Sequence, residues 1–113
     1  RVIHHEVFHI IYLQHKEIFN DKEWIKFNSS KFKYAECSTC TKKIALEKYD
    51  KTEGFFTEYS KSTASEDMAE VYSHMIYLKK NEIDKIRKLD PILNKKISYI
   101  ESKIKKIHPS FTF

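Results

Sequence analysis

Two short clusters of histidine and acidic residues carry most of the chemistry that this sequence can offer. The first is His5-Glu6-Val7-Phe8-His9, an HExxH pattern. On a helix, residues i and i+4 lie one turn apart on the same face, so both imidazoles can reach one ion about 2 Å away. Glu6 would project beside that ion, where a carboxylate can accept the proton of an attacking water. The pattern therefore predicts a zinc site at His5 and His9, with Glu6 as general base.

The second cluster, Glu66-Asp67-Met68-Ala69-Glu70, can complete this site. Two histidines leave a catalytic zinc one protein ligand short, so the third must come from a distant segment. The spacing puts Glu66 and Glu70 on one helical face, where one carboxylate can bind the metal and the other can accept the Nδ1–H of a ligand histidine. A simpler interpretation is that acidic residues complement the dipole of a helix N-terminus, which accounts for Glu66 and Asp67 but leaves the pairing with Glu70 unexplained.

Helices must position these residues. The chain has 113 residues, 41% of them hydrophobic, which predicts one domain with one packed core. A single glycine and two prolines favour long helices over a β-fold with many turns. We expect a mainly α fold with these elements: helices over 1–17, 21–27, 65–78 (able to extend to 88) and 91–107, a loop up to 54, a brief helix or strand at 44–49, and a short strand or extended turn at 55–59.

The apolar side chains predict how these helices pack. In the first helix they form one broad face made of Ile3, Val7, Ile10, Ile11 and Leu13. In the last helix, Leu93, Ile97, Ile100 and Ile104 follow the i, i+4, i+7 rule. We therefore expect the HExxH helix to pack on the helix that carries Glu66, and the last helix to cover the pair.

Charge and composition argue against several other functions. The net charge of +5 is mild, and the lysines are spread along the chain without an aromatic stacking platform, so we expect no nucleic-acid partner. No apolar run approaches the roughly 20 residues that a membrane span needs. Cys37 and Cys40 supply only half of a structural zinc site, so we interpret them as free thiols or a local disulfide in a loop.

Taken together, the two clusters resemble a known family pattern. HExxH followed by E-x-x-A-E, with Tyr59 seven residues before Glu66, is similar to the gluzincin metallopeptidases, notably anthrax lethal factor-like catalytic domains and small zinc-binding metallopeptidases. The segment from Gly54 to Asp67 fits this pattern, whereas the CSTC segment is no part of it. The resemblance implies a role for each of six side chains: zinc ligation by His5, His9 and Glu66, water activation by Glu6, orientation of a ligand histidine by Glu70, and donation to the oxyanion by Tyr59.

These observations lead to one main hypothesis and three alternatives. The resemblance implies a zincin-like core over residues 1–113 that forms the C-terminal part of a longer chain. The β-sheet that precedes the HExxH helix in the family pattern is absent from this sequence, so we expect a helical core with little or no β-sheet. The resemblance also implies Zn²⁺ as cofactor, a peptide or protein as substrate and, weakly, a secreted or cell-surface location. The alternatives are a zinc-binding module that has lost activity, a helical interaction domain whose HExxH is fortuitous, and a pro-form whose site is blocked.

Overall fold

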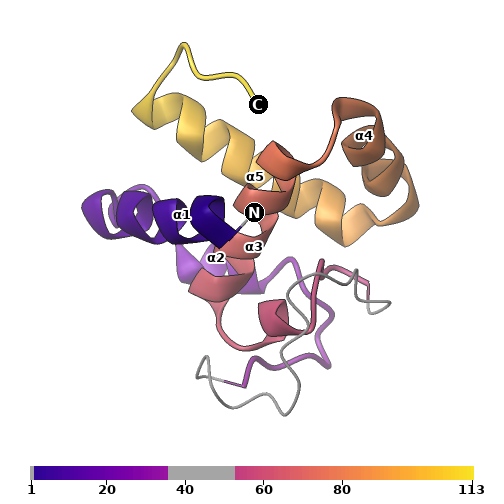
Figure 1. Cartoon of the computed structure of the whole chain (residues 1–113). Coiled ribbons are helices and arrows are strands. Elements are labelled where there is room, and N and C mark those ends of the chain that lie inside the picture. The colour runs from indigo at the N-terminus through magenta and orange to yellow at the C-terminus, as the bar shows by residue number, and fades with distance from the viewer. Residues whose placement is uncertain (1, 36–52) are drawn as a thin grey trace.

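The computed structural model describes residues 2–35 and 53–113, and Figure 1 shows their arrangement. Its elements are five α-helices and one 3₁₀ turn: α1 (Val2–Gln14), α2 (Asp21–Ile25), η1 (Tyr59–Lys61), α3 (Ala64–Tyr77), α4 (Lys80–Leu89) and α5 (Pro91–Ile107). Neither described stretch contains a β-strand, so the expected mainly α fold is confirmed. None of the described helices is long and apolar enough to cross a membrane.

The HExxH helix packs directly on the helix that carries Glu66, as predicted. In Figure 1, α3 lies in the middle of the molecule with α1 on one side and α4 on the other. Phe8 of α1 is fully buried, and its ring lies 5.4 Å from the ring of Tyr72 in α3 and 5.3 Å from that of Phe19. Aromatic pairs at such separations add to the stabilisation from burial alone. This contact fixes α1 against α3 on the face that also carries His5.

The prediction for the buried face of α1 was wrong for four of its five residues, because only Ile11 packs against the core. The structure turns His5 and Phe8 inward and leaves Ile3, Ile10 and Leu13 between 57% and 76% exposed. The cause is that the aromatic and histidine side of the helix contacts α3, whereas most of the aliphatic side faces outward. Hydrophobic periodicity finds an apolar face, but it cannot tell which side of a helix has a neighbour.

Two predicted helix ends also differ from the structure. The first helix ends at Gln14, three residues before the predicted end, and turns follow it. The helix over 65–78 does not extend to Lys88, because Leu78 has an extended backbone (φ −80°, ψ 151°) that separates α3 from α4. The Glu82 carboxylate then accepts the Lys79 backbone N–H at 3.0 Å and caps the start of α4.

The segment before α3 forms a turn. Residues 55–58 have no regular secondary structure and lead into η1, so the predicted short strand at 55–59 is absent and the extended-turn alternative holds. Thr63 then caps α3, because its Oγ1 accepts the Glu66 backbone N–H at 3.1 Å. The possible element at 44–49 lies outside the described residues.

The last helix begins as predicted but packs differently. Asp90 caps α5 by accepting the Leu93 backbone N–H at 3.0 Å, and Pro91 occupies its first turn. α5 packs mainly against α3 and α4, and so does not cover α1 and α3 as a pair. Asp90 also accepts the Gly54 N–H at 2.8 Å. Gly54 has φ +96° and lies so close to Ile92 that an added Cβ would meet it at 2.6 Å, so this position requires glycine.

A buried ion pair ties α3 to α5. Asp67, in the first turn of α3, and Lys96 of α5 are both fully buried, and Lys96 Nζ lies 2.7 Å from Asp67 Oδ2. The same oxygen accepts hydrogen bonds from Trp24 Nε1 and Tyr34 Oη, and Lys96 also donates to the Gly54 carbonyl. Burial raises the pKa of Asp67 and lowers that of Lys96, because loss of water disfavours both charges. The network therefore anchors the first turn of α3.

Replacing Lys96 with Met should lower the free energy of unfolding by about 3–5 kcal/mol, because it leaves the Asp67 carboxylate buried without its counter-charge. Urea denaturation of the metal-free protein measures this loss. Lys95→Met is the matched control, since Lys95 is the exposed neighbour on the same helix and its replacement should change stability by less than about 0.5 kcal/mol. Equal stability of the two variants would show that the ion pair anchors nothing.

Candidate metal centre

The structure brings the two histidines of α1 to one carboxylate of α3. His5 Nε2 lies 2.9 Å from Glu66 Oε1, and His9 Nε2 lies 2.6 Å from the same oxygen. The two imidazole nitrogens are 3.2 Å apart. Three potential ligand atoms thus form a small triangle, although Glu66 lies 61 and 57 positions from the two histidines in the sequence. The i, i+4 spacing of the histidines and the packing of α1 on α3 produce this arrangement.

Two further predicted site residues contact this triangle. The Tyr59 hydroxyl donates to Glu66 Oε2 at 2.6 Å, and His5 Nδ1 lies 2.7 Å from Glu70 Oε2. Glu70 is fully buried. Glu66 and Glu70 stand one turn apart on α3, so one carboxylate meets Nε2 of His5 while the other meets Nδ1. The His5 ring is therefore held from both sides.

Glu6 lies beside the triangle and faces solvent. Its side chain is 69% exposed, and its Oε1 is 3.9 Å from His5 Nε2. Donor atoms of His5, Glu6 and His9 all lie within 4.8 Å of one another. A carboxylate in this position can reach a water molecule at the site while staying accessible to substrate. The structure therefore brings the six side chains that were singled out from the sequence into one region of the fold.

The charges at the site favour a protonated His5 and an ionised Glu66. Burial disfavours the charged imidazole, but hydrogen bonds to Glu66 and Glu70 outweigh it and raise the pKa of His5 from 6.5 to about 9. Burial alone would raise the pKa of Glu66, because it disfavours the charged carboxylate. Hydrogen bonds with His5, His9 and Tyr59 outweigh burial and hold the pKa of Glu66 well below its ordinary value. A proton on His5 thus compensates the two carboxylates in this metal-free arrangement.

The stability of the metal-free protein should fall as pH rises from 6.5 to 9. A protonated His5 stabilises the fold fully below 6.5, where the unfolded ring is also charged, and this stabilisation is lost as pH passes the folded pKa of about 9. The loss should reach at most about 3 kcal/mol. Urea denaturation in the presence of a chelator at several pH values measures it. The trend should be absent from His5→Asn and present in His15→Asn, and a parent protein with no such trend would contradict the prediction.

The donor set suits zinc. Two imidazole nitrogens and one carboxylate oxygen are a usual protein ligand set of catalytic zinc, with a further position open, whereas calcium and magnesium prefer oxygen ligands alone. Ligand atoms of a tetrahedral zinc lie roughly 3.3 Å apart, so the present separations of 2.6–3.2 Å would need to widen by about 0.1–0.7 Å. His5, His9 and Glu66 therefore fit the ion with little rearrangement.

Sequence reasoning missed some residues that build the site. Thr57 and Ser60 are fully buried, and Thr57 Oγ1 donates to Glu70 Oε1 at 2.8 Å. Asp67 was interpreted only as an acidic first-turn residue that complements the helix dipole, whereas it also anchors α3 through its ion pair with Lys96. The pattern T-x-x-S beside the glutamate helix is too common to have singled out Thr57 and Ser60, and a buried Asp–Lys pair leaves no local signal.

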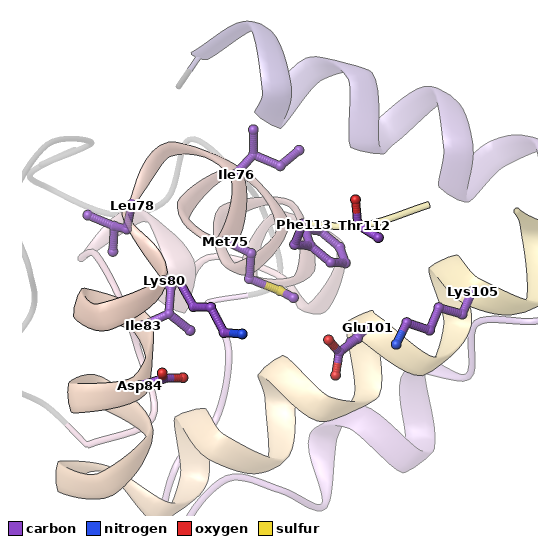
Figure 2. Close-up of a pocket in the computed structure, with 10 residues that line it drawn as sticks. All are labelled: Met75, Ile76, Leu78, Lys80, Ile83, Asp84, Glu101, Lys105, Thr112 and Phe113. Atoms are coloured by element: carbon purple, nitrogen blue, oxygen red, sulfur yellow. The ribbon is translucent and has the colours of Figure 1, made fainter. Parts of the chain in front are cut away.

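Other polar residues and the described cavity lie apart from the site. A cavity of about 290 Å³ is lined by residues of α3, α4 and α5 and by the C-terminal residues, among them Met75, Lys80, Glu101 and Phe113 (Figure 2). His74 of α3 stacks on Phe56, with the two ring centroids 4.4 Å apart. Cys37 and Cys40 lie outside the described residues.

Comparison with known proteins agrees with this geometry. A family model described as "Putative zinc-binding metallo-peptidase" matches residues 1–108. The chain belongs to this family. Membership of this family indicates a protease that uses zinc and acts on a peptide or protein. No curated protein and no solved structure matches the chain.

Proposed function

We propose that this protein is a gluzincin-type zinc metalloendopeptidase in which His5, His9 and Glu66 bind the metal. The observation that carries the proposal is the convergence of Glu66 Oε1 on both imidazoles, at 2.9 and 2.6 Å, from a helix remote in sequence. A fortuitous HExxH would give no reason for a carboxylate of another helix to meet both rings. This geometry therefore favours a metal site over a helical interaction domain.

Glu6 acts as the general base in this proposal. Zinc, when bound, supplies Lewis acidity that polarises a peptide carbonyl and acidifies water. The Glu6 carboxylate is solvent-exposed next to His5, so it can accept the proton of an attacking water and later pass that proton to the leaving amine. No other carboxylate in the described part of the site combines this exposure with this position, because Glu66 is largely buried and Glu70 is fully so.

Tyr59 supplies a hydrogen-bond donor for the oxyanion. Its hydroxyl is held at the site by Glu66 Oε2 at 2.6 Å, and its ring centroid lies 5.8 Å from that of His5. A phenol in such a position can turn its proton toward the oxygen on which negative charge develops. Tyr59 thereby complements Glu6, which handles the proton of the nucleophile.

Glu70 orients His5. As a carboxylate it can only accept, so the proton of a neutral His5 must reside on Nδ1, and the Nε2 lone pair is left for the metal. Two buried contacts, with His5 and with Thr57, keep this carboxylate in place.

Hydrolysis of a peptide library tests this function. The zinc-loaded protein should cleave peptides, lose the activity when a chelator removes the metal, and regain it when zinc is restored. Cleavage products identified by mass spectrometry would also give the sequence preference. Tight zinc binding without cleavage of any library member would support the inactive-module alternative, and cleavage that survives chelation would rule out zinc chemistry.

A further inference from the structure

One short turn delivers hydroxyl groups to both glutamates of α3. Thr57 Oγ1 lies 2.8 Å from Glu70 Oε1, and two residues later Tyr59 Oη lies 2.6 Å from Glu66 Oε2. Glu66 and Glu70 are one helical turn apart in α3. The two residues that contact them, Thr57 and Tyr59, are two positions apart in the sequence. The segment from Thr57 to Ser60 is thus shaped to hold the two carboxylates that meet the His5 ring.

The hydrogen bonds of the Thr57 hydroxyl run in one direction, from Ser60 to Glu70. An ionised Glu70 can only accept, so the Thr57 hydroxyl donates its single proton to Glu70 Oε1. Ser60 Oγ, 3.0 Å from Thr57 Oγ1, must then donate to Thr57. The Ser60 backbone N–H also donates to Thr57 Oγ1 at 3.2 Å. This order fixes the rotation of the Thr57 side chain, because a rotated hydroxyl would leave a buried polar group without its partner.

Burial makes the arrangement rigid. Thr57, Ser60 and Glu70 are all 0% exposed, so bulk solvent does not replace a lost contact among them. In surroundings with little water, loss of one partner leaves the other with the full cost of its desolvation. The Glu70 carboxylate is therefore held through Oε1 by Thr57 and through Oε2 by His5.

We propose that Thr57, supported by Ser60, is a positioning residue that sets the affinity for zinc by acting through Glu70 on His5. This inference rests on the proposed function, because it takes His5 as a metal ligand. The Thr57 hydroxyl fixes the Glu70 carboxylate, and Glu70 fixes the plane and the protonated nitrogen of the imidazole. Thr57 is itself fully buried, so its route to the site is the contact with Glu70.

Zinc affinity of matched Thr57 variants tests this role. Thr57→Val keeps the size and branching of the side chain but lacks the hydroxyl, so its dissociation constant for zinc should rise about 10-fold, at the lower end of the range for residues that support metal ligands. Thr57→Ser keeps the hydroxyl and should lie within about twofold of the parent. Competition with a fluorescent zinc chelator measures both. An unchanged affinity in Thr57→Val, or a Ser variant as weak as the Val variant, would overturn the proposal.

A double-mutant cycle separates positioning from general damage to the fold. If Thr57 acts only through Glu70, Thr57→Val should weaken zinc binding little further once Glu70→Gln is present. Additive effects of the two substitutions would show that Thr57 acts by another route. Should Thr57→Val fail to fold, Ser60→Ala replaces it in the cycle with an expected weakening of about threefold, and no weakening there would count against the proposal.

A second measurement keeps this inference distinct from the proposed function. The Nδ1–H proton of His5 should give a downfield nuclear magnetic resonance signal in the metal-free protein, because it donates to a carboxylate at 2.7 Å. Thr57→Val should accelerate its exchange with solvent, and Thr57→Ser should not. Absence of peptide cleavage or of zinc binding in the parent would defeat the proposed function, whereas this signal would still decide whether Thr57 holds the Glu70–His5 contact.

Discussion

Replacement of Glu6 with Gln should lower kcat/KM for peptide hydrolysis by at least about 100-fold, the usual contribution of a positioned general base. The amide has nearly the size of the carboxylate but cannot accept a proton from water. The Glu6 side chain is 69% exposed and contacts neither glutamate of α3 at hydrogen-bond distance in the described structure, so zinc content and stability should stay close to those of the parent. Steady-state kinetics on a cleaved library peptide, with zinc analysis of the same samples, measure both.

Glu17→Gln is the matched control for this prediction. Glu17 has the same charge and a similar exposure of 72%, and its carboxylate likewise lies near a histidine, 3.8 Å from His15 Nδ1, but away from the triangle. It should retain full activity. If Glu6→Gln hydrolyses peptides as fast as Glu17→Gln, another group activates the water and the proposed mechanism is wrong.

Removal of the Glu66 carboxylate should weaken zinc binding by more than about 100-fold, because it removes one of three protein ligands. This loss exceeds the roughly 10- to 100-fold effect of removing a residue that only hydrogen-bonds a ligand. Glu66→Ala also removes the group that meets both imidazoles at 2.9 and 2.6 Å. The measurement is zinc content after dialysis, together with competition titration against a chelator of known affinity.

Asp84→Ala serves as the control for the loss of a carboxylate, since Asp84 is an exposed residue of α4 outside the site. It should bind zinc as the parent does. A Glu66→Ala protein that retains the parent affinity would show that α3 contributes no ligand, and the third ligand would have to be sought elsewhere.

Motifs with a geometric consequence were the part of the molecule that the sequence predicted well. HExxH placed His5 and His9 on one face of a helix, and α5 spans the predicted residues 91–107. The spacing of Glu66 and Glu70 was enough to predict that they share a face of α3. In each case, the local rule and the tertiary structure agree.

Features that depend on remote neighbours were not predictable. The aliphatic face of α1 looked like its buried side, yet packing against α3 buries His5 and Phe8 instead. No glycine or proline near Leu78 predicts a helix end, yet the backbone is extended there and separates α3 from α4. Likewise, the burial of Asp67 against Lys96 depends on contacts with α2 and α5 that no local pattern encodes.

The ligand set of bound zinc is the central claim, and X-ray absorption at the zinc edge tests it most directly. We expect a first shell of nitrogen and oxygen atoms at about 2.0–2.1 Å with the multiple scattering of two imidazoles. His5→Ala should reduce that scattering to a single ring. A sulfur shell at about 2.3 Å would instead assign the metal to Cys37 and Cys40 and contradict the site described for His5, His9 and Glu66.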